Sequence, residues 1–129
     1  MSATSLLADI FFVNVQVFGS KKSPAVRKAQ RFFAERRIQV HFVDFAERAM
    51  AKGELARFIQ KFGVQALIDR SSKRFGELGL GASVLSDARW EAKLLDEPML
   101  LVQPLVRHQH QLTIGDAEPT WKSWVEAAS

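Results

Sequence analysis

The first third of the chain carries two strand patterns with a helix pattern between them. Residues 10–18 are rich in β-branched and aromatic side chains and end at Gly19, which predicts a strand with one buried face. Apolar residues at helical spacing then predict a helix over 24–37, with Ser23 as its N-cap and a proline as its first residue. Alternation returns over 38–45 and predicts a second strand. This succession indicates a parallel pair joined by a right-handed crossover.

The middle of the chain, from about residue 50 to 97, carries helical patterns and no strand pattern. Three helices are expected there. The first ends at Gly63, the second is short and runs from Ser71 to Leu78, and the third is capped by Ser86.

Strand patterns return near the end of the chain. Residues 99–106 are apolar and contain Pro104, which marks an edge, a bulge or a bend because proline cannot donate to a sheet. A polar turn over 107–111 and a short strand over 112–114 complete a predicted hairpin. A last helix follows Pro119, with tryptophans at helical spacing on its core side.

The composition is typical of a globular protein and excludes cysteine chemistry. The chain has 129 residues, 47% of them hydrophobic and 25% charged, and no apolar run approaches the roughly 20 residues of a membrane span. Residues 1–12 lack a basic start and contain Asp9, so we expect no signal peptide and a cytoplasmic location. The chain has no cysteine, which excludes disulfides, thiolate metal sites and thiol nucleophiles.

Positive charge is concentrated in one predicted loop and helix. The formal net charge is +4, and residues 20–37 contain seven basic side chains against Glu35 alone. Such a patch suits a small oxyanion, an acidic protein surface or nucleic acid, although a solvated helix face explains it equally well. We find no recognisable nucleic-acid module in the sequence.

Several short stretches, in a fixed order, carry a family resemblance. They are Val17–Gly19 followed by Ser23–Ala29, then Leu67–Ser71, Phe75–Leu80, Glu97–Val106, and finally Leu112–Gly115 with Trp121. On these residues the chain resembles the arsenate reductase-like family, which includes glutaredoxin-coupled arsenate reductases, Spx-type regulators and YffB-type proteins. The resemblance covers about residues 13 to 127. It implies an α/β fold with a thioredoxin-like mixed sheet (β-α-β, helical insertion at about 50–97, β-β-α) in a single domain over 1–129.

The resemblance also implies positions for a family site. In that family a cysteine at the start of the first helix is the nucleophile, arginines around it hold an oxyanion, and a proline, usually cis, faces it. Here the nucleophile position falls on Ser23, and the arginine before the proline is replaced by Gln103, with Pro104 retained. The resemblance therefore implies an anion- or glutathione-binding group, which comprises Lys21, Lys22, Ser23, Ala25, Arg70, Gln103 and Pro104.

Each of these candidates has a simpler interpretation. Ser23 needs an activating base to act as a nucleophile, and its role as a helix cap explains the residue completely. Arg70 and the basic loop would look the same in a relic site without useful affinity. His108 and His110 have strand spacing, but the sequence near them offers few further ligands, and we expect no metal site.

We therefore expect a non-catalytic family member that acts by binding, without a cofactor other than glutathione, and as a monomer. Its expected contact surface is Arg27, Lys28 and Arg31 on the first helix. The partner would be an acidic protein surface, by analogy with the Spx branch, or a small anion. The alternative is a glutathione- or glutaredoxin-dependent reductase, in which Ser23 is an engineered replacement or glutathione supplies the thiol.

Overall fold

The computed structural model describes residues 14–128, which fall into two compact units. The sheet unit contains the chain up to Val43 and again from Gln103, and the helical unit is Asp44–Val102. The strand expected over 10–18 begins outside the described residues. Residues 1–12, in which we expect no signal peptide, also lie outside them. The single domain over 1–129 stays a prediction.

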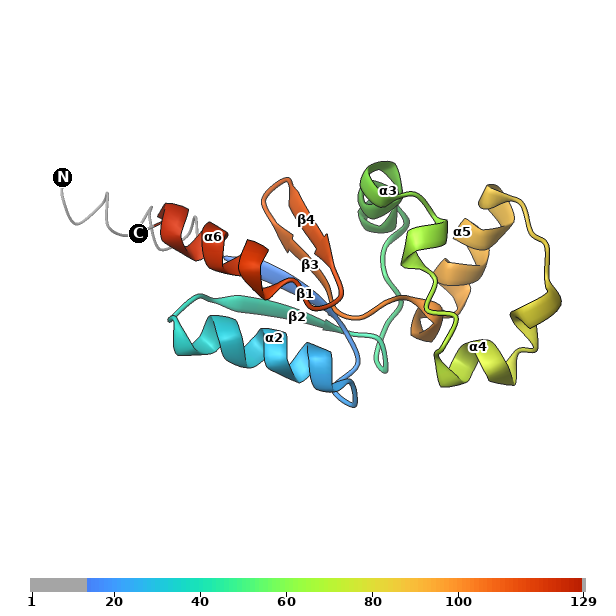
Figure 1. Cartoon of the computed structure of the whole chain (residues 1–129), viewed down its shortest axis with the longest axis horizontal. Helices are drawn as coiled ribbons and strands as arrows, with labels where there is room; N and C mark the ends of the chain where they lie inside the picture. Colours follow the sequence, from blue (N-terminus) through green and yellow to red (C-terminus); the bar gives the residue numbers. More distant parts are fainter. Residues whose placement is uncertain (1–13, 129) are drawn as a thin grey trace. The chain divides into compact units, whose positions relative to one another are not determined.

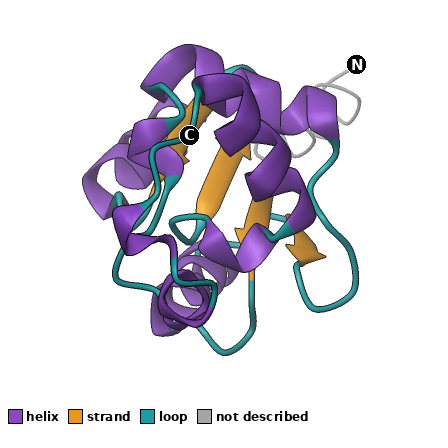
Figure 2. Cartoon of the chain, turned by 90° about the vertical axis from the view of Figure 1, so that its right-hand side faces the viewer, coloured by secondary structure: helices purple, strands orange, loops and turns teal. Residues whose placement is uncertain are grey.

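Four strands form one mixed sheet in the order β2-β1-β3-β4 (Figure 1). Their bounds are Val15–Gly19 for β1, Val40–Asp44 for β2, Leu105–His108 for β3 and Gln111–Ile114 for β4. Strand β3 runs antiparallel to both of its neighbours, with Val17 opposite Val106. Figure 2 distinguishes the strands from the helices by colour. The predicted α/β class and mixed sheet are confirmed.

Helices α2 (Pro24–Glu35) and α6 (Glu118–Ala128) pack on the same core of the sheet unit. That core joins apolar residues of β1, α2, β3 and α6 with one residue between α2 and β2. The residues of the four elements are Val15, Val17, Val26, Ala29, Phe32, Phe33, Val106, Trp121 and Trp124, and the connecting residue is Ile38. Trp121 is fully buried, and its indole N–H donates to Thr113 Oγ1 over 2.8 Å. The polar end of this large side chain is thus satisfied inside the core.

Helix α2 begins as predicted but ends earlier. It stops at Glu35 instead of Arg37, because Arg37 adopts a left-handed conformation with φ 60°. The N–H of Arg37 donates to Ala34 O, and the N–H of Ile38 donates to Phe33 O, both over 3.0 Å. This pair of bonds is a Schellman motif, which satisfies the last carbonyls of a helix and usually places glycine where Arg37 lies.

The helical unit contains the three helices that the sequence predicts. They are α3 (Lys52–Phe62), α4 (Lys73–Glu77) and α5 (Asp87–Asp96). Two 3₁₀ turns, Gln65–Leu67 and Leu80–Ala82, connect them, and a third, Pro98–Leu100, follows α5. Helix α4 begins at Lys73, after its N-cap Ser72, and not at Ser71 as predicted. The Ser71 N–H and hydroxyl instead both donate to Asp69 Oδ1. None of the described helices is long and apolar enough to span a membrane.

The strand predicted over 99–106 is wrong in its first half. Residues 98–100 form a 3₁₀ turn that starts with a proline, and Leu101 makes a single bridge to Ile68. The regular strand starts only at Leu105, after the Gln103–Pro104 peptide, which is cis. Pro104 has no N–H to donate, so it cannot extend the strand backward.

The left-handed Arg37 gives a stability prediction. Arg37→Gly should raise the free energy of unfolding by about 0.5–1 kcal/mol, because glycine removes the clash of a Cβ at positive φ but orders a more flexible residue. Urea unfolding measures this. Arg36→Gly is the matched control, since Arg36 has φ −101° and its guanidinium lies 3.7 Å from the Phe32 ring centroid. If both variants lose stability, Arg37 is not strained.

Candidate functional site

The loop between β1 and α2 is a tight turn organised by Ser20. Ser20 is buried, at 5% exposure. Its hydroxyl accepts the Lys22 N–H over 3.2 Å, and its carbonyl accepts the Ser23 N–H over 3.0 Å. Lys21 and Lys22 are exposed, so this turn presents two ammonium groups while its backbone is held from inside.

Gln103, in the segment just before β3, holds this turn from the neighbouring strand's side. The Ser20 N–H donates to Gln103 Oε1 over 2.7 Å, across 83 residues of sequence. Gly19 makes this approach possible. A Cβ at that position would lie 2.4 Å from Val26 Cγ2 and 3.1 Å from Gln103 Oε1. Any side chain at residue 19 would therefore push α2 or Gln103 away.

Ser23 acts as the N-cap of α2. Its Oγ accepts the Val26 N–H over 3.3 Å, and its carbonyl accepts the Arg27 N–H over 3.1 Å. Pro24 has no N–H, so of the first-turn amides only that of Ala25 lies outside these interactions. Among the described residues, the Val26 N–H is the one hydrogen-bond partner of the Ser23 hydroxyl. No histidine or carboxylate of the described chain activates it.

The three predicted contact residues of α2 differ in their surroundings. Arg31 and Arg27 are exposed, and Arg27 Nη1 donates to Lys21 O over 2.8 Å. Lys28 is instead bound within the sheet unit, with its Nζ 2.7 Å from Asp116 Oδ2 and 3.3 Å from Glu118 Oε1.

The Lys28 ion pairs change the charge that α2 presents. The hydrogen bond from Lys28 lowers the pKa of Asp116, and the bonds to Asp116 and Glu118 raise the pKa of Lys28. The two carboxylates therefore offset the charge of Lys28 on the surface of α2. The cationic face of α2 rests mainly on Arg27 and Arg31.

Arg70 lies in the helical unit, in a setting of its own. Its Nη2 donates to Gln65 Oε1 over 2.7 Å. Its guanidinium carbon lies 5.6 Å from the ring centroids of both Phe75 and Trp90. Cation–π contacts and one amide acceptor orient this side chain, while the residue remains exposed. The shared anion site that the resemblance implies for Arg70 and Ser23 stays a prediction.

The two C-terminal histidines have different environments. His108 is buried on β3, its Nδ1 is 3.0 Å from Asn14 O, and its ring is 5.6 Å from that of Trp124. His110 is exposed in the following turn. Their spacing of two residues therefore does not place the rings together.

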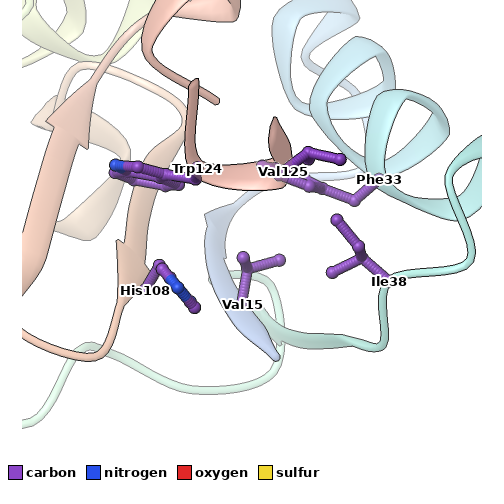
Figure 3. A pocket seen from close by; sticks show the side chains of 6 residues that line it. All are labelled: Val15, Phe33, Ile38, His108, Trp124 and Val125. Carbon is purple, nitrogen blue, oxygen red and sulfur yellow. The ribbon is translucent and has the colours of Figure 1, made fainter. Parts of the chain in front are cut away.

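A small cavity beside His108 is lined otherwise by apolar side chains (Figure 3). The lining residues are Val15, Phe33, Ile38, His108, Trp124 and Val125, and the volume is about 10 Å³. This is about the space that one water molecule needs. The cavity is a gap in packing rather than a ligand site.

Sequence reasoning missed Gly19, Ser20, Asp116 and Glu118 as parts of this region. A glycine directly followed by a small polar residue at the end of a strand was a usable signal for a close approach. The two acidic residues lie about 90 positions after Lys28, and no local pattern links them to it.

A family model and several solved structures relate the chain to the same family of proteins. The model of the ArsC family matches residues 18–123. The YFFB protein superposes with a TM-score of 0.77 at 18% identity, over 86% of this chain and 98% of its own. The arsenate reductase from Vibrio cholerae gives 0.73 at 24% identity, over 86% and 97%. An arsenate reductase (ArsC) related protein from Brucella melitensis gives 0.63 at 21%, over 85% and 92%. No curated protein matches the chain in sequence.

The Gln103 bond gives a prediction about this loop. Gln103→Leu removes the acceptor of the buried Ser20 N–H and should cost about 1–3 kcal/mol of unfolding free energy. Hydrogen exchange at the Ser20 amide should speed up by at least tenfold. Gln103→Glu keeps an acceptor oxygen and is the control, in which Ser20 should stay protected. Equal exchange at Ser20 in the Leu variant and the unmodified chain would show that the bond does not hold the loop.

Proposed function

The chain belongs to the ArsC family, and we propose that it acts by binding a partner and not by catalysis. The partner in this proposal is an acidic protein surface, and the contact is the cationic face of α2, carried by Arg27 and Arg31. The protein works as a cytoplasmic monomer in this proposal. The observation that carries it is the engagement of the Ser23 hydroxyl as a helix cap.

The surroundings of Ser23 support the loss of chemistry. A serine hydroxyl becomes a useful nucleophile only when a base removes its proton. Here the Oγ accepts a backbone N–H over 3.3 Å, and the described residues supply no base beside it. The chain has no cysteine to take the same role from another position.

Gln103 supports the same proposal. The resemblance implies an oxyanion-holding arginine at this position. A guanidinium has only donors, so it could not accept the Ser20 N–H that Gln103 Oε1 accepts over 2.7 Å. The side-chain carbonyl of Gln103 therefore stabilises the loop between β1 and α2. The two exchanged positions, Ser23 and Gln103, both accept a backbone N–H.

The exposed cations of the loop and of α2 support a role in binding. Lys22 and Arg31 are exposed to solvent in the loop and on α2. The Arg27 guanidinium donates a hydrogen bond to Lys21 O of the same loop. Cations grouped on one helix and its N-terminal turn attract a negatively charged surface and accelerate its encounter. Lys28 contributes less than the sequence suggests, because Asp116 and Glu118 bind it.

A small anion is the second candidate ligand, favoured by the Ala25 N–H and the lysines of the loop. Glutathione, through a carboxylate, and phosphate belong to this class. Titration of phosphate, arsenate and glutathione against the unmodified chain and the variant Lys21→Ala with Lys22→Ala separates the two candidates. An affinity that falls tenfold in this variant would favour the small anion over the protein partner.

Charge reversal tests the partner surface. Arg27→Glu with Arg31→Glu should reduce recovery of a captured partner by at least tenfold, because two attractive charges become repulsive. Capture by the tagged full chain, followed by mass spectrometry at 50 and 300 mM salt, measures this. Arg48→Glu with Arg57→Glu makes the same charge change at exposed residues of the helical unit and should retain the partner. Unchanged recovery with the α2 variant would exclude this surface.

A turnover assay tests the absence of catalysis. With arsenate, glutathione and glutaredoxin, the protein should give no reduction above the uncatalysed background, because it lacks a thiol nucleophile. Ser23→Cys restores a thiol but not an arginine at position 103, and serves as the comparison. Clear turnover by the unmodified chain would support the reductase alternative, in which glutathione supplies the thiol.

A further inference from the structure

The exposed side of α5, in the helical unit, forms a groove that the proposed function does not use. The groove has a volume of about 450 Å³ and is lined by Leu85, Arg89, Ala92, Lys93 and Asp96. The last four residues share one face of α5, since they are three or four positions apart. Leu85 comes from the segment just before the helix. The volume lies within the range of about 300–1,000 Å³ that is usual for ligand sites.

Two cations of this groove have no ion-pair partner among the described residues. Arg89 and Lys93 are four positions apart, so they are neighbours along one side of α5. Arg74 of the same unit differs, with its Nε 2.7 Å from Glu97 Oε1. The hydrogen bond from Arg74, and more weakly the charge of Lys93, lower the pKa of Glu97. Lys93 thus acts on Glu97 only through space, and its ammonium remains available.

Apolar surface lies at the start of the same helix. Val84 exposes 96% of its surface and precedes Leu85, which is half-buried. Val84 and Met99 are the large apolar side chains exposed in the described part of the chain, and Met99 is only 37% exposed. An almost fully exposed valine, one residue before a leucine that lines the groove, is a point where a partner gains by burying surface.

We propose that this groove binds a short peptide segment of a partner protein, with two acidic side chains next to an apolar one. The acidic groups pair with Arg89 and Lys93, and the apolar side chain contacts Leu85 and Val84. Asp96 repels a further carboxylate at the other end and so sets the direction of the peptide. This site lies in the helical unit and is independent of the α2 surface.

The test uses the full chain and a fluorescein-labelled peptide of alternating glutamate and leucine, with fluorescence anisotropy at 50 mM salt. We expect Arg89→Glu with Lys93→Glu to weaken binding at least tenfold, and Val84→Ser to weaken it about threefold. Lys52→Glu with Arg57→Glu on α3 makes the same charge change away from the groove and should stay within twofold. A peptide of alternating lysine and leucine should not bind.

Three results would overturn this assignment. One is no binding of the acidic peptide at millimolar protein. Another is equal binding by the unmodified chain and the Arg89 and Lys93 variant. The third is loss of binding with Arg27→Glu and Arg31→Glu, which would place the peptide on α2 and support the proposed function instead. Because the α2 and α5 surfaces are tested with different variants, either proposal can be refuted without refuting the other.

Discussion

The hydrogen bond from the Ser20 N–H to Gln103 Oε1 is the contact on which the candidate site depends. It joins the end of β1 to the segment before β3 over 2.7 Å, and Gly19 leaves the space for it. Ser20 then holds the Lys22 and Ser23 amides. The start of α2, and with it the direction of its cations, follows from a loop that is tied at both ends.

This constraint explains why two residues that depart from the ArsC pattern fit together. Ser23 and Gln103 each offer an oxygen to a backbone N–H. The resemblance implies a cysteine and an arginine at these two positions. A thiol is a weak acceptor and a guanidinium is none, so those residues would leave the two backbone donors less well paired. In our proposal, the two replacements therefore exchange an oxyanion site for a loop held by internal hydrogen bonds. The basic charge around it is retained at Lys21, Lys22 and Arg27.

The sequence was sufficient for features with a local cause. The caps Ser23 and Ser86 act within three residues, so the starts of α2 and α5 were predictable, as was the order of strands and helices. The end of α2 was not predictable, because Arg37 adopts a left-handed conformation that is unusual for a residue with a Cβ. The Lys28 ion pairs and the Gln103 bond connect residues more than 80 positions apart. Such contacts are set by the fold, and no spacing in the sequence indicates them.

The central claim is that Ser23 caps a helix and is not an activated nucleophile. Covalent labelling tests it most directly: the folded protein is treated with a fluorophosphonate, which reacts with activated serines, and Ser23 is examined by mass spectrometry beside a serine protease as positive control. The cap interpretation predicts no adduct on Ser23 after the control has reacted completely. An adduct that forms on Ser23 when the chain is folded, and does not form when the chain is unfolded before treatment, would contradict it.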